Sequence, residues 1–226
     1  MSERLKVAPL TKEERVTVIS VSIRLSIYTA MITAFALSLK AIIIHEGLDA
    51  FYEGHWVENL QMLLLLALTA IIYAAIAKLS AKDHGVLAKA IALLAAFAVI
   101  REGDAFWDRV IPVLGWELLG TLVFAALVYV IVQGSHYFPR QVATFMGMRG
   151  MTLAWAGFMV AIPLAQIVAH GPLFQLIMGA EYMNTFKRMI EETLELVGYM
   201  MIFFSSVEHF YQTGCWQRIM GKSQPL

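Results

Sequence analysis

The sequence predicts an all-α membrane protein, a bundle of about six transmembrane helices arranged as three successive hairpins. Composition indicates this class first, because 59% of the 226 residues are hydrophobic and only 15% are charged. A soluble domain has about 45–50% apolar and about 25% charged residues. Long, continuous apolar runs are the second indication, since a helix needs about 20 mainly apolar residues to cross the hydrocarbon core of a bilayer.

Six runs meet this requirement: residues 25–44, 59–77, 86–106, 116–133, 151–169 and 190–207. The apolar stretch 16–23 either lengthens the first helix or lies in the membrane interface. We therefore expect a cytoplasmic or interfacial N-terminal segment at 1–24, a transmembrane domain at 25–208 and a cytoplasmic tail at 209–226. Pro163 is expected to kink the fifth helix, because proline removes a backbone donor from the helix interior.

Basic residues set the predicted orientation. With the N-terminus in the cytoplasm, ten of the 17 lysines and arginines fall in cytoplasmic segments and five on the opposite side. The positive-inside rule then predicts that both chain ends are cytoplasmic. Twelve of the 17 acidic residues lie on the other side or at the outer helix ends.

Several classes of partner and cofactor are disfavoured by the sequence. The 17 basic and 17 acidic residues cancel, whereas a nucleic-acid partner would favour a basic patch. Cys215 is the one cysteine, which excludes an intrachain disulfide and argues against an iron–sulfur cluster. No nucleotide fingerprint or haem attachment motif is present. The expected partners are the lipid bilayer and either another membrane protein or a second copy of the chain.

Polar residues gather in three clusters, at 45–58, 101–117 and 181–195. Counted from residue 86, Arg101 and Glu102 lie about 22–24 Å along their helix, and Glu195 lies about 18 Å from the end of its run. These groups are therefore expected below the headgroups. Ionisable groups at that depth face the bundle interior or a wet cavity and pair with one another.

Helical spacing assigns these groups to faces. Arg101, Asp104 and Asp108 are spaced i, i+3 and i+7, which predicts one stripe of the third helix. A second stripe, on the sixth helix, holds Arg188, Glu191, Glu192, Glu195 and Tyr199.

Ion pairing within the sixth helix leaves one carboxylate without a basic partner. Lys187 can pair with Glu191, and Arg188 with Glu192, at a spacing of four residues. Glu195 has no such local partner. It requires Arg101, Lys40, a proton or another cation.

These residues predict a carboxylate and arginine cluster at the extracytoplasmic end of the bundle that binds a proton or a divalent metal ion, for transport or membrane-embedded chemistry. The candidate ligands are Glu58, Glu102, Asp104, Asp108, Glu192 and Glu195. The supporting residues are Arg101, Arg109, Arg188, Glu191, His45, Glu46 and Tyr199.

Two alternatives stay open. The first is a non-catalytic accessory subunit of a larger membrane complex, in which the cluster is a structural ion network. The second is an enzyme acting on lipid, with Glu195 as its acid or base. At the other end of the sixth run, Glu208 and His209 are interpreted as an interfacial pair whose side chains reach the headgroups.

Two motifs carry a resemblance. Arg101-Glu102-x-Asp104-Ala105-Phe106-x-Asp108-Arg109, followed by Glu191-Glu192-x-x-Glu195-Leu196-x-Gly198-Tyr199, resembles a family of uncharacterised bacterial inner-membrane proteins. This likeness covers residues 56–210 and implies a multi-pass protein of the bacterial inner membrane, with the acidic motifs as its signature and no activity attached. Arg101-Glu102-Gly103 and His45-Glu46-Gly47-Leu48-Asp49 also resemble the Arg-Glu-Gly-Leu-Glu motif of high-affinity iron permeases, which implies iron handling.

Overall fold

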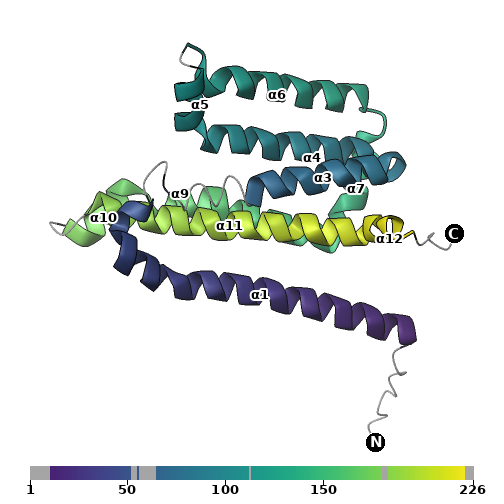
Figure 1. Ribbon diagram of the computed structural model, residues 1–226, viewed down its shortest axis with the longest axis horizontal. Helices are drawn as coiled ribbons and strands as arrows, with labels where there is room; N and C mark the ends of the chain where they lie inside the picture. The colour runs from purple at the N-terminus through teal and green to yellow at the C-terminus, as the bar shows by residue number, and fades with distance from the viewer. Residues whose placement is uncertain (1–10, 52–54, 56–64, 112, 180–182, 222–226) are drawn as a thin grey trace, which may run out of the picture. The chain divides into compact units, whose positions relative to one another are not determined.

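The computed structural model describes residues 11–51, 55, 65–111, 113–179 and 183–221. Every element within these ranges is a helix (Figure 1), which confirms the all-α prediction. Four helical segments are long and apolar enough to cross a membrane: Lys12–Phe51, Asp83–Glu102, Gly115–Gln133 and Arg149–Val168. A membrane protein is therefore supported, while the count of six spans and their orientation stay predictions.

The chain divides into two units, one ending at His45 and one beginning at Glu46. Helix α1 (Lys12–Glu46) makes up almost all of the described part of the first unit and ends one residue beyond it. Thr11 starts it with a capping box, in which the Glu14 amide donates to Thr11 Oγ1 at 3.2 Å and the Thr11 amide donates to Glu14 Oε2 at 2.8 Å. Because α1 runs without a break through residues 16–23, this stretch lengthens the first helix.

The second unit is a set of packed helices. In chain order they are η1 (Gly47–Phe51), α3 (Ala67–Leu79), α4 (Ala81–Glu102), α5 (Asp104–Val110), α6 (Gly115–Gln133), α7 (Phe138–Met146), α8 (Arg149–Met159), η3 (Val160–Leu164), α9 (Ala165–Val168), α10 (Gly171–Met178), α11 (Asn184–Gln212) and α12 (Cys215–Ile219). Helix α4 packs between α3 and α6, and α11 packs along α8 and η3. Residues 59–64, the start of the predicted second run, lie outside the described residues.

The third predicted run is divided in two. Helix α4 ends at Glu102, Gly103 has non-helical backbone angles, and α5 begins at Asp104. Figure 1 shows α5 lying across the adjacent ends of α4 and α6. The prediction of one continuous helix over 86–106 is therefore wrong, and so is the stripe that joined Arg101 to Asp104 and Asp108.

A π-helical turn lies at Pro163, where a kink is predicted. Residues Val160–Leu164 form this turn between α8 and α9. Proline residues and π-bulges are both recognised causes of helix kinks. Helix α9 then carries Gln166 toward α11, where its side-chain amide meets Glu191.

Glycines bring α8 and α11 together. A Cβ atom built on Gly198 would lie 2.6 Å from both the Ala161 Cβ and the Gly157 carbonyl oxygen. Side chains cannot approach this closely, so the two backbones are in direct contact here. Small residues at helix contacts are the usual means of close packing inside membranes.

Candidate functional site

A polar cavity of about 190 Å³ lies where α4, α5, α9 and α11 meet. Its lining residues are Arg101, Glu102, Asp104, Gln166, Arg188, Glu191, Glu192 and Glu195. We call this cavity the carboxylate pocket. Five carboxylates and two guanidinium groups line it, and every one of the five is an acidic residue that the sequence singled out.

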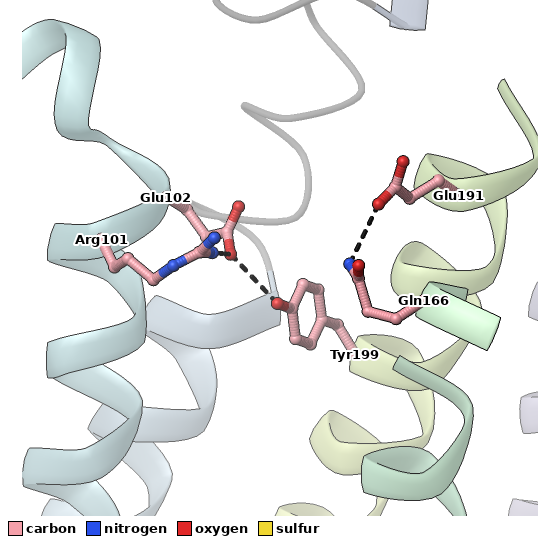
Figure 2. Close-up of polar contacts among 5 residues, drawn as sticks. All are labelled: Arg101, Glu102, Gln166, Glu191 and Tyr199. Carbon is pink, nitrogen blue, oxygen red and sulfur yellow. Dashed lines mark hydrogen bonds and ion pairs between the residues drawn. The ribbon is translucent and has the colours of Figure 1, made fainter. Parts of the chain in front are cut away.

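Glu102 joins α4 to α11 within this pocket. Its Oε1 accepts a hydrogen bond from the Tyr199 hydroxyl at 3.1 Å and an ion pair from Arg101 Nη1 at 2.7 Å (Figure 2). The Glu102 side chain is only 11% exposed, whereas that of Arg101 is 62% exposed. The arginine therefore reaches in from the surface to neutralise a largely buried carboxylate.

Glu191 uses both of its oxygens. Oε1 accepts from Gln166 Nε2 at 2.9 Å (Figure 2), and Oε2 pairs with Lys187 Nζ at 3.0 Å. The second contact confirms the predicted pair at a spacing of four residues. The first contact joins α9 to α11, and the second neutralises Glu191.

Glu195 stands apart from these two carboxylates. It is partly buried, lies one helical turn beyond Glu191 and lines the same pocket. Within the described ranges it makes no hydrogen bond or ion pair, and Arg101, whose charge also acts on Glu195, pairs with Glu102.

Other predicted site residues lie elsewhere. Asp108 does not line the pocket; its Oδ1 accepts from the Trp116 amide at 3.3 Å and so caps the start of α6. Arg109 is exposed on α5. His45 and Glu46 are the last two residues of α1. Glu58 lies outside the described residues.

The predicted metal ligands do not form a metal-binding geometry in the described part of the chain. Among the described residues, no three histidine, cysteine, aspartate or glutamate side chains converge closely enough to hold a metal ion. The helix break at Gly103 contributes to this absence, because Asp108 of α5 then contacts the start of α6 and does not line the pocket. A metal at this site therefore stays a prediction.

The buried end of α11 was not expected. Glu208 is 2% exposed and His209 is fully buried, so their interpretation as an interfacial pair is wrong. The His209 ring packs against Tyr73, His84 and Phe145 at centroid distances of 5.4, 5.4 and 4.7 Å. The sequence does hold a signal, because Ser205, Glu208, His209 and Gln212 follow the i, i+3, i+4, i+7 spacing of one helix face.

Comparison with models of known protein families, with curated proteins and with solved structures gave no match to this chain. The resemblance of the two acidic motifs to a bacterial inner-membrane family accordingly stays a prediction.

Replacing His209 by phenylalanine is expected to raise thermal stability. Within the described residues neither ring nitrogen of His209 has a hydrogen-bond partner, and an unpaired buried polar group costs about 1–3 kcal/mol. Phenylalanine fits the same aromatic surroundings without that cost. Unfolding of the purified chain in detergent would measure the change, with the exposed His136→Phe as a control of little effect. Strong destabilisation by His209→Phe would show that the imidazole makes a stabilising hydrogen bond.

Replacing Gly115 by alanine is expected to separate α5 from α6. Gly115 has φ +49°, and an added Cβ would overlap Asp108 Oδ1. The left-handed backbone alone costs about 1–2 kcal/mol for a non-glycine residue. Gly47→Ala is the control for the positive φ, because Gly47 has φ +70° and open space around it. A larger loss of stability at Gly115 than at Gly47 supports the Asp108 cap; equal losses would contradict it.

Proposed function

We propose that the chain is a multi-pass membrane protein that binds a cation in the carboxylate pocket, with Glu195 as the group that receives it. The charge of the pocket carries this proposal. Five carboxylates and two guanidinium groups line the cavity, and Lys187 adds one charge through its pair with Glu191. These described groups retain an excess of two negative charges, which a bound cation would offset.

A proton suits the pocket better than a divalent metal. Calcium takes six to eight oxygen ligands and magnesium requires near-octahedral geometry, but Glu102 and Glu191 are already engaged by Arg101, Tyr199, Lys187 and Gln166. A proton needs one free carboxylate oxygen, and Glu195 supplies it. Carboxylates that gain and lose protons inside membranes are typical of pumps and transporters, so we propose proton-coupled transport as the activity.

In this proposal the chain keeps the six predicted spans, with both ends in the cytoplasm of a bacterium and the pocket at the extracytoplasmic side of the inner membrane. The distribution of lysine and arginine supports that orientation. The resemblance of the two acidic motifs supports the choice of membrane.

A structural role is the second candidate function. The bonds of Glu102 and Glu191 join α4, α9 and α11, as expected of an accessory subunit whose ion network holds the bundle together. The two candidates differ over Glu195. A structural network has no use for an unpaired carboxylate, whereas a cation site requires one.

The thermal unfolding midpoint of the full chain in detergent tests the proposal. We expect the wild-type midpoint to fall as rising pH removes the proton from Glu195, because the pocket then gains a negative charge. Glu195→Gln should lose this response. Glu191→Gln is the matched control: it should keep the response and lose stability, because its bond to Lys187 is weakened.

Mg²⁺, Ca²⁺ and Mn²⁺ form the second arm of this experiment. A stabilisation by one of them that disappears in Glu195→Gln would identify a metal rather than a proton as the cation. Identical responses of the wild type and Glu195→Gln to pH and to all three ions would refute a cation site at Glu195.

A further inference from the structure

A second cavity lies near the other end of α4 and α11. Its lining residue His84 is separated from Glu102 by about 27 Å along α4. The cavity has a volume of about 500 Å³ and is lined by Ser80, Asp83, His84, Tyr137, Arg140, Gln141, Thr144, Gln212, Thr213 and Arg218. We call it the glutamine pocket. Figure 1 shows α7, α12 and the end of α11 gathered on this side of the second unit.

Gln141 presents an unused donor to this pocket. Its side chain is 4% exposed, and its Oε1 accepts a hydrogen bond from the Leu87 amide of α4 at 2.9 Å. A backbone N–H can only donate, so this bond fixes which way the side-chain amide points. Nε2 is left without a partner in the described part of the chain. Because Gln141 lines the cavity, this donor is available to a ligand oxygen there.

Gln212 repeats the arrangement from α11. Its Oε1 accepts from the Gly150 amide at 3.2 Å, so its NH₂ group is again the end that is free to donate. Two glutamines on different helices are thus oriented by backbone amides of two further helices, α4 and α8. Their donors line one cavity.

Charge selects the kind of ligand. Arg140 and Arg218 line the pocket and Asp83 is the one carboxylate among its lining residues, so the lining has an excess of positive charge. Arg218 Nη1 also donates to the Leu79 carbonyl, which anchors it at the end of α3. The first turns of α4 and α7 contribute Asp83, His84, Arg140 and Gln141 to the lining. Helix N-termini favour anions.

We propose that the glutamine pocket binds a phosphate group, carried by a lipid headgroup or by a soluble phosphate ester. Guanidinium groups match phosphate oxygens in geometry and charge, and the two amides supply neutral donors between them. The volume lies within the range of about 300–1,000 Å³ typical of small-molecule sites. It leaves room for the group to which the phosphate is attached.

Binding to the purified full chain tests this proposal with two probes. The first is inorganic phosphate in neutral detergent, with chloride at equal ionic strength as the blank. The second is a phosphatidylcholine nanodisc with or without phosphatidic acid. Bound lipid is measured by native mass spectrometry and bound phosphate by the shift of the unfolding midpoint.

Gln141→Glu is the decisive variant, because it keeps an acceptor for the Leu87 amide and turns the free donor into a negative oxygen. We expect it to abolish binding, and Arg140→Gln to weaken binding about tenfold, equivalent to about 1.4 kcal/mol. Arg149→Gln, an exposed arginine outside the pocket lining, should bind like the wild type.

Two results support the proposal and distinguish a lipid headgroup from a soluble phosphate ester as the source of the phosphate group. Stabilisation by inorganic phosphate indicates a soluble ester, and retention of phosphatidic acid alone indicates a lipid. Absence of binding to both probes would overturn it. So would binding that Gln141→Glu and Arg140→Gln leave unchanged, or that Arg149→Gln reduces equally.

Discussion

Glu195→Lys is expected to fold with a free energy of unfolding within about 1 kcal/mol of the wild type. Its unfolding midpoint should no longer respond to pH or to added cations in the range where that of the wild type responds. A lysine at this position would place a tethered ammonium group among carboxylates that outnumber the guanidinium groups of the pocket. It would therefore take the place of the bound cation. Exposed or partly exposed charge changes are otherwise worth about 0–1 kcal/mol.

Glu191→Lys is the matched charge reversal, one turn earlier on the same helix. It should destabilise by about 1–3 kcal/mol, because it breaks two bonds, one to Gln166 and one to Lys187, and places two ammonium groups side by side. The thermal unfolding midpoints of the two variants in detergent distinguish a cation site from a structural ion network. If Glu195→Lys is the more damaging of the two, the pocket was already neutral and the structural network is the better account.

Gly198→Ala is expected to cost about 2–3 kcal/mol, a typical penalty for overpacking a well-fitted contact. The added methyl group would lie 2.6 Å from the Ala161 Cβ and from the Gly157 carbonyl oxygen. Helices α8 and α11 would have to separate, and α11 carries Glu191, Glu195 and Tyr199. We therefore expect the cation response to weaken together with stability.

Gly147→Ala serves as the control for this substitution. A Cβ at Gly147 meets only the Thr144 carbonyl oxygen, at an ordinary 3.5 Å. Urea or thermal unfolding of both variants in the same detergent would compare them. Equal stability of the two alanine variants would show that the glycine contact between α8 and α11 is not needed.

Helices with one uninterrupted apolar run could be predicted closely from the sequence. The predicted span 116–133 corresponds to α6, Gly115–Gln133. The break at Gly103 could not, because apolar and polar residues on both sides of it continue a helical pattern. Gly103 ends α4 and Asp104 begins α5, and the direction of α5 is set by its packing against α6.

The candidate site was predictable where it depends on spacing within one helix. The Lys187–Glu191 pair and the unpartnered Glu195 both follow from positions on α11. Contacts between helices were not predictable in this way. The Tyr199 hydroxyl meets Glu102 across 97 positions of sequence, and Gln166, which follows the π turn at Pro163, meets Glu191 across 25.

The glutamine pocket could not be predicted from the sequence. Gln141 and Gln212 are ordinary polar residues in the sequence, and nothing in their spacing links them. Their significance comes from the backbone amides of Leu87 and Gly150, which orient the two side chains. Only tertiary structure supplies that information.

Infrared difference spectroscopy of the reconstituted chain tests the central claim most directly, since a protonated carboxyl group has a C=O stretching band that a carboxylate lacks. We predict such a band in the wild type near neutral pH, its loss on raising the pH, its absence in Glu195→Gln and its retention in Glu191→Gln. A spectrum without a protonated carboxyl band, or a band that Glu195→Gln leaves unchanged, would contradict the assignment of Glu195 as the proton-binding group.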